Sequence, residues 1–455
     1  MTTIQDLLSN IRLSLQSSHL GNRTPVGKTT PGLYHYEHRE QGERSRIHLR
    51  IDADGSGLLL VNANRVMHLN ATAAFMARLA LDEVPEEHAI AALKQTYHVS
   101  PAQARRDYHE FKAKLDELIR PDGACPIHDL DLEITTPFSA RPSAPYRMDL
   151  ALTYRCNNDC AHCYNARERD FGELDTHSWF DILDRLWDQA IPHVVFTGGE
   201  PTLREDLPDL IAHAESNGQI TGLNTNGRRL SDRRYVEKLV QAGLDHVQIT
   251  LESHAAAIHD RMVQRKGAWK QTVAGIQNAL ETPLYVMTNT TMLRDNSPQM
   301  AETLDFLASL GVPTLGLNAL IYSGHGKTVG TGLDEKELPA LLQMAREHTE
   351  AHGQRLIWYT PTQYCNFDPM QLELGVKGCT AALYNMCVEP DGGVLPCQSY
   401  YQPMGNLLTT PWEAIWHHDL AVSLRERRYV SERCTDCVLL SECGGGCPLS
   451  LPGGE

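Results

Sequence analysis

Three cysteines occur within eight residues of the sequence, in the stretch CNNDCAHC. Cys156, Cys160 and Cys163 follow the spacing C-x3-C-x2-C, without a fourth cysteine nearby. Thiolates this close together suit a compact centre of soft metal ions, above all a 4Fe–4S cluster. Three ligands leave one iron free to chelate a bidentate small molecule. A zinc site completed by His162 is the alternative, but His162 is too close in sequence to bond comfortably beside both flanking cysteines.

Eight further cysteines lie near the C-terminal end of the sequence, and one, Cys125, stands alone. In a reducing cytoplasm such clustering indicates metal ligation rather than disulfides. A zinc ribbon is the alternative for Cys434 and Cys437, which have C-x2-C spacing. The predicted metal ligands are Cys365, Cys379, Cys387, Cys397, Cys434, Cys437, Cys443 and Cys447.

The composition is that of an ordinary globular protein, with 42% hydrophobic and 22% charged residues. A net charge of −16 argues against a nucleic acid or an anionic membrane as the main partner. The opening MTTIQDLLSNIRLSLQSS has no uninterrupted apolar core, so no signal peptide is predicted. No stretch approaches the roughly 18 to 20 apolar residues of a membrane-spanning helix. We therefore expect a cytoplasmic protein.

The cysteine triplet has to be positioned by the elements around it. Between residues 146 and 340, six strand patterns alternate with helical patterns, which predicts an α/β fold with a partial (β/α)6 TIM-like barrel. The triplet follows the first strand directly. Functional side chains of such barrels collect at the carboxyl ends of the strands, so the triplet is expected there.

The rest of the chain divides into four further parts. Residues 1–45 are predicted as a short helix followed by a mobile lead, and residues 121–145 as a Pro-rich linker. Residues 46–120 show a hairpin pattern around DGSG and three helical patterns, which indicates a small winged-helix-like domain. Its acidic residues outnumber its basic ones, which argues against DNA binding. Residues 341–455 lose periodicity and form a Cys-rich iron–sulfur domain, held by metal sites rather than by apolar burial.

The triplet, with an aromatic residue before its last cysteine, resembles the signature of radical S-adenosylmethionine (SAM) enzymes. TGGEP, which ends the second predicted strand, resembles the GGEP element of that family. The resemblance implies that the backbone here, with the Glu200 carboxylate, holds the amino group of SAM. Glycines allow close approach of the backbone, and a carboxylate pairs with an ammonium group. A plain turn is the alternative. The residues concerned are Gly198, Gly199, Glu200 and Pro201.

The same resemblance implies contacts with the ribose and carboxylate of SAM at the ends of the next three strands. SHAAAIHDRMVQRKGAW, which ends at Trp269, also resembles a family stretch of the form HDxxRxxGxF. Polar packing at strand ends is the alternative for each residue. The implied contacts are Asn224 and Asn226, within the stretch NTNG, then Glu252, Ser253 and Asn289.

The family resemblance implies a mechanism in which the open iron at the triplet chelates SAM. One electron from the reduced cluster then cleaves SAM, and the 5'-deoxyadenosyl radical abstracts hydrogen from an unactivated C–H bond. The protein orients SAM and substrate and keeps water away. An electron donor such as a flavodoxin or a ferredoxin is implied as a partner.

The C-terminal cysteines closely resemble the SPASM extension, which binds one or two auxiliary 4Fe–4S clusters. Cys379 is followed by twelve residues, Gly392, four residues and Cys397, and the last four cysteines spell C-x2-C-x5-C-x3-C. The SPASM pattern expects one more cysteine after these, where the sequence reads LPGGE. We hypothesise that Cys365 or Cys387 replaces it. The rival hypothesis is an auxiliary cluster with an open iron that binds substrate.

The winged-helix-like unit resembles the peptide-recognition element of ribosomal-peptide maturases, a relative of the peptide chaperone of pyrroloquinoline quinone biosynthesis. The stretch LLLVNANRVMHLNATAAFMARLAL carries this likeness. Such elements bind a leader peptide as an added strand. A dimerisation module is the alternative. The resemblance implies a peptide maturase that installs a thioether or carbon–carbon crosslink. Two other functions stay open, namely a haem or tetrapyrrole side-chain-modifying enzyme and a non-catalytic iron–sulfur sensor.

Overall fold

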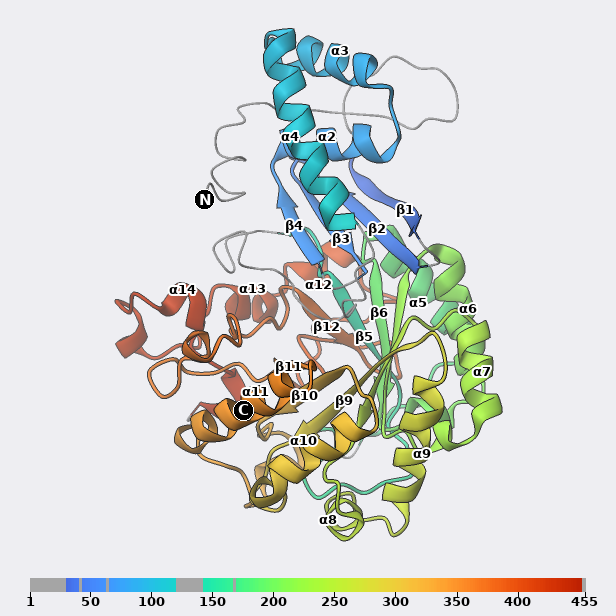
Figure 1. Cartoon of the computed structure of the whole chain (residues 1–455), viewed down its shortest axis with the longest axis vertical. Helices are drawn as coiled ribbons and strands as arrows, with labels where there is room; N and C mark the ends of the chain where they lie inside the picture. The colour runs from blue at the N-terminus through green and yellow to red at the C-terminus, as the bar shows by residue number, and fades with distance from the viewer. Residues whose placement is uncertain (1–29, 41–42, 63–64, 120–141, 167–168, 452–455) are drawn as a thin grey trace. The chain divides into compact units, whose positions relative to one another are not determined.

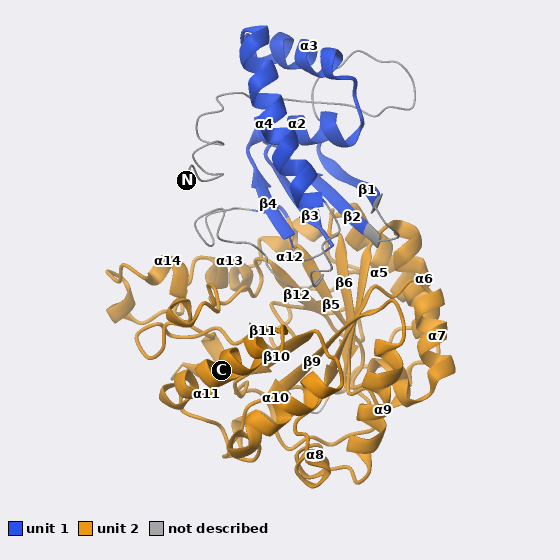
Figure 2. Ribbon diagram, in the orientation of Figure 1, with its two compact units in different colours: residues 1–143 blue, residues 144–455 orange. Residues whose placement is uncertain are grey.

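The computed structural model describes residues 30–40, 43–62, 65–119, 142–166 and 169–451, with both termini outside. The chain divides into two compact units, residues 1–143 and 144–455 (Figure 2). The predicted N-terminal helix, Cys125 and most of the predicted linker lie outside the described residues. No helix within the described ranges is long and apolar enough to cross a membrane.

The first unit contains an antiparallel sheet in which consecutive strands are neighbours. Its strands are β1 (Gly32–Glu40), β2 (Glu43–Ile51), β3 (Gly57–Val61) and β4 (Arg65–Leu69). The predicted hairpin corresponds to β2 and β3. Strand β1 lies in the stretch that the sequence analysis treated as a mobile lead, and that interpretation was wrong for these residues. Its alternating His, Glu and Arg residues look like solvated chain, and only the ladder with β2 makes them a strand.

Three helices follow this sheet, as the sequence predicts; the first packs on the strands, the third on the first, and the second on the third. They are α2 (Ala71–Leu81), α3 (Glu86–Tyr97) and α4 (Pro101–Ile119). Asn70 caps α2, since its side-chain oxygen accepts from the backbone N–H of Ala73 over 2.9 Å. Buried residues of the helices, such as Phe75, form one apolar core with the inward side chains of the strands, such as Leu49 and Leu59.

The second unit is built on a nine-stranded sheet whose first six strands follow chain order and run parallel. This arrangement confirms the predicted partial barrel of six β/α units. The six strands are β5 (Arg147–Thr153), β6 (His193–Gly198), β7 (Ile220–Thr225), β8 (His246–Thr250), β9 (Tyr285–Thr291) and β10 (Thr314–Asn318).

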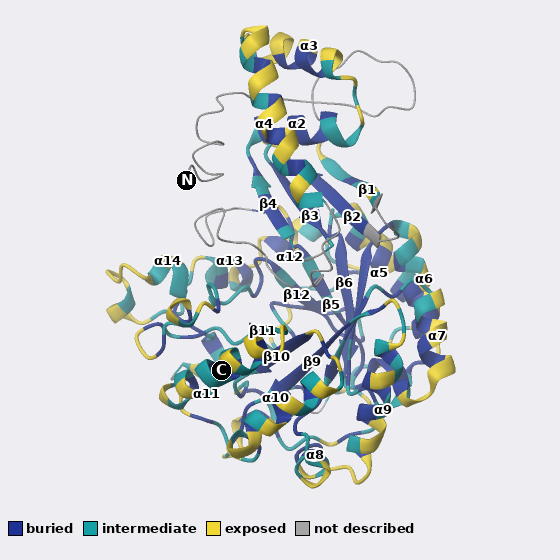
Figure 3. Cartoon of the chain, in the orientation of Figure 1, coloured by how far each residue is buried: buried dark blue, intermediate teal, exposed yellow. Residues whose placement is uncertain are grey.

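Amphipathic helices cover the sheet and expose their outer faces (Figures 1 and 3). In the first of them, Trp179, Ile182, Leu183 and Leu186 recur at helical spacing, and all four are buried against the strands. The helices are α5 (Thr176–Asp188), α6 (Leu207–Asn217), α7 (Arg233–Gln241), α8 (Ala256–Met262), α9 (Ala268–Leu280), α10 (Met300–Ser309) and α11 (Leu338–Ala351).

Three short strands complete the sheet at its two ends. On one side β11 (Arg355–Trp358) pairs parallel with β10. On the other, β12 (Asn385–Val388) pairs parallel with β5 and antiparallel with β13 (Val394–Leu395). The Cys-rich part of the chain therefore contributes strands to the barrel sheet.

The boundary that the sequence analysis places at residue 340 falls inside helix α11. The helix continues through this position because Leu342, Ala345 and Thr349 repeat its buried face. Beyond β13 the described residues form three short α-helices and two 3-10 turns, in keeping with the lost periodicity. The α-helices are α12 (Trp412–Trp416), α13 (Asp419–Arg425) and α14 (Leu440–Cys443). The five-part division as a whole stays a prediction.

Candidate functional site

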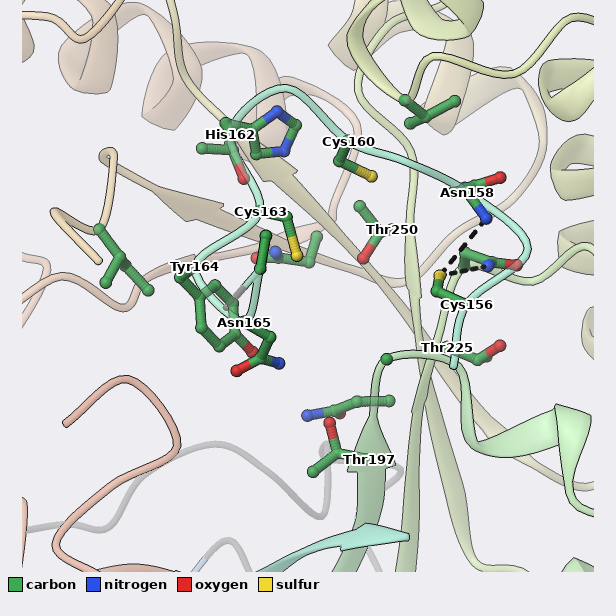
Figure 4. A pocket seen from close by; sticks show the side chains of 18 of the residues that line it. Cys156, Asn158, Cys160, His162, Cys163, Tyr164, Asn165, Thr197, Thr225 and Thr250 are labelled. Carbon is green, nitrogen blue, oxygen red and sulfur yellow. Dashed lines mark hydrogen bonds between the residues drawn. The ribbon is translucent and has the colours of Figure 1, made fainter. Parts of the chain in front are cut away.

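A cavity of about 410 Å³ opens at the carboxyl ends of the parallel strands. Its walls are the cysteine loop after β5 and the last residues of the five strands that follow (Figure 4). Because each of these strands has polar residues at or next to its end, the cavity offers amide and hydroxyl groups from several directions. These come from Thr197, Asn224, Thr225, Gln248, Thr250, Asn289, Thr291 and Asn318, and Glu252 adds a carboxylate.

The three cysteines of the loop all line this cavity, and Figure 4 shows their sulfur atoms facing the same space. The backbone N–H of Asn158 donates to Sγ of Cys156 over 3.4 Å. Burial raises the pKa values of the Cys160 and Cys163 thiols, and the charge of Cys163 raises that of Cys160 further. In such surroundings a metal centre, rather than water, has to stabilise the thiolates.

The geometry fits a multi-iron cluster better than a zinc ion completed by His162. Nε2 of His162 is hydrogen bonded to Oε1 of Glu252 over 2.9 Å, and both side chains are buried. The imidazole is thus already committed to a carboxylate. Among the described residues, no three His, Cys, Asp or Glu side chains converge as ligands of a single ion would. A cluster of several irons holds its thiolates farther apart than one ion does.

Gly198, the last residue of β6, and Gly199 allow the cysteine loop and the strand end to touch. Gly199 N donates to the carbonyl of Thr153 over 2.7 Å. A Cβ on Gly198 would lie 2.1 Å from that same carbonyl oxygen, and one on Gly199 would lie 2.5 Å from the carbonyl oxygen of Arg155. Both glycines line the cavity, as predicted. Their lack of side chains is what brings β5 and β6 together there.

Glu200 lies behind the cavity wall rather than in it. Its carboxylate is fully buried and accepts from the hydroxyl and N–H of Thr202, the hydroxyl of Thr225 and the N–H of Asn226, over 2.6 to 3.1 Å. Burial raises the pKa of Glu200, and these hydrogen bonds oppose the rise. Thr225 and Asn226 both line the cavity. Glu200 therefore fixes two wall residues from behind.

The structure brings six of the nine residues predicted to bind SAM to the cavity wall. These are Gly198, Gly199, Asn224, Asn226, Glu252 and Asn289. Glu200, Pro201 and Ser253 do not line it. The carbonyl of Ser253 instead accepts from the indole N–H of Trp269 over 3.2 Å. Within the described stretch 253–269, this contact ties the first residue to the last and thus serves packing.

Sequence reasoning missed four polar residues at strand ends that line the cavity. They are Gln248, Thr250, Thr291 and Asn318. Each lies within three residues of the end of a strand that the sequence analysis had already identified. Listing every polar residue at these strand ends would have found them.

The C-terminal cysteines fall into a buried group and a more exposed group. The backbone N–H of Ala382 donates to the carbonyl of Pro396 over 3.0 Å, which joins the segments of Cys379 and Cys397. Burial raises the pKa of the Cys379 thiol, and the charges of Cys447 and Cys397 raise it further. Burial, followed by the charge of Cys447, raises the pKa of Cys397 to about 12. Cys387 is fully buried on β12 beside Ala151 and Leu395. Thiols this deep fit the ligands of an auxiliary cluster.

The more exposed group comprises Cys365 and Cys437, which are exposed, and Cys434 and Cys443, which are half-buried. The backbone N–H of Tyr364 donates to Sγ of Cys443 over 3.3 Å, so the segment that carries Cys365 lies against the last of these cysteines. All eleven described cysteines are free of disulfides.

Three family models match this chain in succession. Coenzyme PQQ synthesis protein D (PqqD) matches residues 57–118, the Radical SAM superfamily residues 150–307, and the SPASM iron–sulfur cluster-binding domain residues 379–438. The radical SAM match covers the triplet and the ends of β6 to β9, which form much of the cavity.

Two kinds of curated relative are similar to this chain. The PqqA peptide cyclase of Streptomyces rochei is 31% identical over 318 residues, which are 67% of this chain and 84% of the relative. The Fe-coproporphyrin III synthase of Methanosarcina barkeri is 28% identical over 324 residues, 65% of this chain and 81% of the relative.

Solved structures show the same fold. Streptococcus suis SuiB bound to the precursor peptide SuiA superposes with a TM-score of 0.66 at 18% identity, covering 89% of this chain and 94% of SuiB. SuiB bound to S-adenosylmethionine gives the same values. Native anSMEcpe with bound AdoMet gives a TM-score of 0.55 at 17% identity, covering 67% of this chain and 90% of that one.

These matches agree with the architecture and with the cavity. The cofactors are SAM and iron–sulfur clusters, one of them the 4Fe–4S cluster of the radical SAM domain. The chain belongs to the radical SAM superfamily, as an enzyme with a PqqD-like unit before its barrel and a SPASM iron–sulfur segment after it.

Proposed function

We propose that this enzyme modifies a ribosomally made precursor peptide and installs an oxidative crosslink, either a thioether or a carbon–carbon bond. The observation that carries the proposal is the combination in one chain of a PqqD match, a radical SAM match and a SPASM match. Relatives with the name PqqA peptide cyclase support a peptide substrate. The precursor peptide is thus the proposed partner.

In this proposal Cys156, Cys160 and Cys163 hold the radical SAM cluster, and the polar strand ends around the cavity hold SAM. The cluster and SAM together supply a 5'-deoxyadenosyl radical, which removes a hydrogen atom from the peptide. Closing the crosslink releases a second hydrogen as a proton and an electron. An auxiliary cluster held by the C-terminal cysteines would accept that electron. The walls of the cavity orient the reactants and exclude water.

The first unit would bind the leader of the peptide. A sheet accepts an added strand only at an outer edge, and the outer strands here are β1 and β4. Strand β1 already covers the β2 side of the hairpin predicted from sequence. The outer edges of β1 and of β4 (Arg65–Leu69) are therefore the two proposed sites for the leader.

Co-expression with a small precursor peptide from the same gene neighbourhood tests this function. We expect the peptide to lose the mass of two hydrogen atoms per crosslink, and the Cys156→Ala/Cys160→Ala/Cys163→Ala variant to leave it unchanged. An unmodified peptide in the presence of enzyme that still cleaves SAM would contradict the proposal.

A tetrapyrrole substrate is the second candidate, because the Fe-coproporphyrin III synthase relative is similar over nearly the same length. Incubating the reduced enzyme with SAM and either a precursor peptide or an iron porphyrin separates the two. The sensor hypothesis requires that no 5'-deoxyadenosine forms.

A flavodoxin or ferredoxin is the proposed reductant. The cytoplasm is the proposed location, since the described cysteines are free thiols.

A further inference from the structure

Cys365, Cys434, Cys437 and Cys443 come from two separate stretches of sequence that contact each other. Cys434, Cys437 and Cys443 follow one another within a short turn-rich segment around α14. Cys365 comes from the loop after β11, well upstream. What joins the two stretches is a set of contacts between residues 362–364 and the segment 433–446.

The contacts reach both ends of that segment. At one end, Nη2 of Arg433 lies 3.5 Å from Oε1 of Gln363. At the other end, Nε2 of Gln363 donates to the carbonyl of Gly445 over 3.4 Å. Gly446 packs so closely that a Cβ on it would lie 2.8 Å from Cγ of Gln363. The upstream loop thus spans the segment that carries three cysteines.

Cys443 is held directly by this loop. Its Sγ accepts from the N–H of Tyr364 over 3.3 Å and lies 3.6 Å from the carbonyl oxygen of Thr362. Backbone N–H groups that point at cysteine sulfurs are a usual feature of iron–sulfur sites. The N–H groups of Asn366 and Phe367 both donate to the carbonyl of Gln363, so residues 363–367 form one turn with Cys365 at its centre.

Cys387, the other cysteine that lies outside the SPASM spacing, is in different surroundings. It is fully buried on β12, packed with Ala151 and Leu395, and its Sγ lies 3.6 Å from the carbonyl oxygen of Val388. In the β12–β13 ladder Cys387 pairs with Leu395, two residues before Cys397 of the buried group. This pairing groups Cys387 with Cys397.

We propose that Cys365 is the fourth thiolate of an auxiliary 4Fe–4S cluster whose other ligands are Cys434, Cys437 and Cys443. The buried group, Cys379, Cys387, Cys397 and Cys447, then ligates a second cluster. Each set supplies the four thiolates that a closed 4Fe–4S cluster needs. Neither auxiliary cluster has an open iron, so neither binds a substrate thiolate directly.

Iron content and Mössbauer spectra test the assignment in a background without the radical SAM cluster. In full-length Cys156→Ala/Cys160→Ala/Cys163→Ala protein we expect roughly eight irons per chain. Adding Cys365→Ala should destroy or degrade one of the two clusters and leave at most roughly four irons per chain in an intact cluster. Adding Cys434→Ala instead should have the same effect. Adding both should cost no more than either alone. Cys387→Ala is the matched control, and its loss should add to that of Cys365→Ala.

Full iron content and unchanged spectra after Cys365→Ala would overturn the proposal. So would a loss that adds to that of Cys434→Ala, since Cys365 would then serve the other cluster. Alkylation of the unmutated holoprotein gives a measurement that does not depend on how a variant folds. Cys365 is exposed, so a free thiol there would react with iodoacetamide at once. We expect protection that is lost when iron is removed, and immediate labelling would contradict the proposal.

Discussion

The hydroxyl of Tyr164 donates a hydrogen bond to Oε1 of Gln398 over 3.1 Å. Tyr164 directly follows Cys163 of the triplet, and Gln398 directly follows Cys397 of the buried C-terminal group. The amide of Gln398 also donates to the carbonyl of Gly198 over 3.2 Å and accepts from the hydroxyl of Thr197. One side chain thus ties the SPASM segment to the cysteine loop and to the end of β6.

Replacement of Gln398 by Leu should loosen this connection. The three hydrogen bonds are lost together, and we expect unfolding to become easier by about 1 to 3 kcal/mol and SAM to bind more weakly. Tyr164→Phe removes only one of the bonds and should cost about 0.5 to 1.5 kcal/mol. Thermal unfolding of the anaerobic holoprotein, with SAM titrations, measures both. Equal effects of the two variants would show that the other two bonds contribute nothing.

Glu200→Gln should disturb the cavity wall indirectly, because Glu200 lies behind the wall and holds Thr225 and Asn226 in place. Its carboxylate accepts four hydrogen bonds, and an amide NH2 would face donors at one of the two oxygen positions. A buried polar group left without its partner costs about 1 to 3 kcal/mol. We expect lower stability and weaker SAM binding. Glu205→Gln is the control, because Glu205 pairs with Arg229 at the surface. Comparable losses in both variants would refute a specific role for Glu200.

Alanine at Gly198 or Gly199 should separate the cysteine loop from β6. At both positions the new Cβ would overlap a backbone carbonyl oxygen, which no side-chain rotation relieves. We expect a loss of about 1 to 3 kcal/mol or more and reduced reconstitution of the triplet cluster. Gly172→Ala is the matched control, since a Cβ there meets nothing within 4 Å. Normal cluster content in Gly198→Ala would argue against the close approach.

The buried His246 should make the fold sensitive to acid. Burial, followed by the positive charge of Arg147, lowers its pKa from 6.5 to about 3. Between these values the unfolded chain binds the proton and the folded chain does not, so stability falls as the pH drops below 6.5.

At about pH 5.5 the linkage amounts to about 1.4 kcal/mol relative to about pH 7.5. His246→Gln should lose this part of the pH dependence, as denaturant unfolding at the two pH values can measure. The same slope in the variant would assign the acid sensitivity to other groups.

Local spacing is what made the triplet and the two glycines predictable. Cys156, Cys160 and Cys163 must converge within one loop, and nothing distant in the sequence alters that. The role of Glu200 was not predictable in the same way. Its partners Thr225 and Asn226 come from the end of β7, and only the parallel pairing of β6 with β7 brings them near. A contact of this kind leaves no periodic trace in either segment.

The strand patterns were predictable where strands are buried on both faces. In β6 every residue is buried, and its continuous apolar run shows in the sequence. Strands β11 and β12 have four residues each, and β13 has two, which is too short for a period to appear. Strand β1 lies at the edge of its sheet, and polar and charged residues are interspersed along its sequence. The structure of these strands is set by pairing rather than by pattern.

The pairing of β12 with β5 limits how this enzyme can be divided. In the described sheet, β12 is the neighbour of β5 on the side away from β6. A chain cut before Asn385 would leave the backbone groups of β5 uncovered along that side, and such an open apolar edge invites aggregation. Truncations and chimaeras that exchange SPASM segments between relatives should therefore keep β12 and β13 with the barrel, and join the sequences after Leu395.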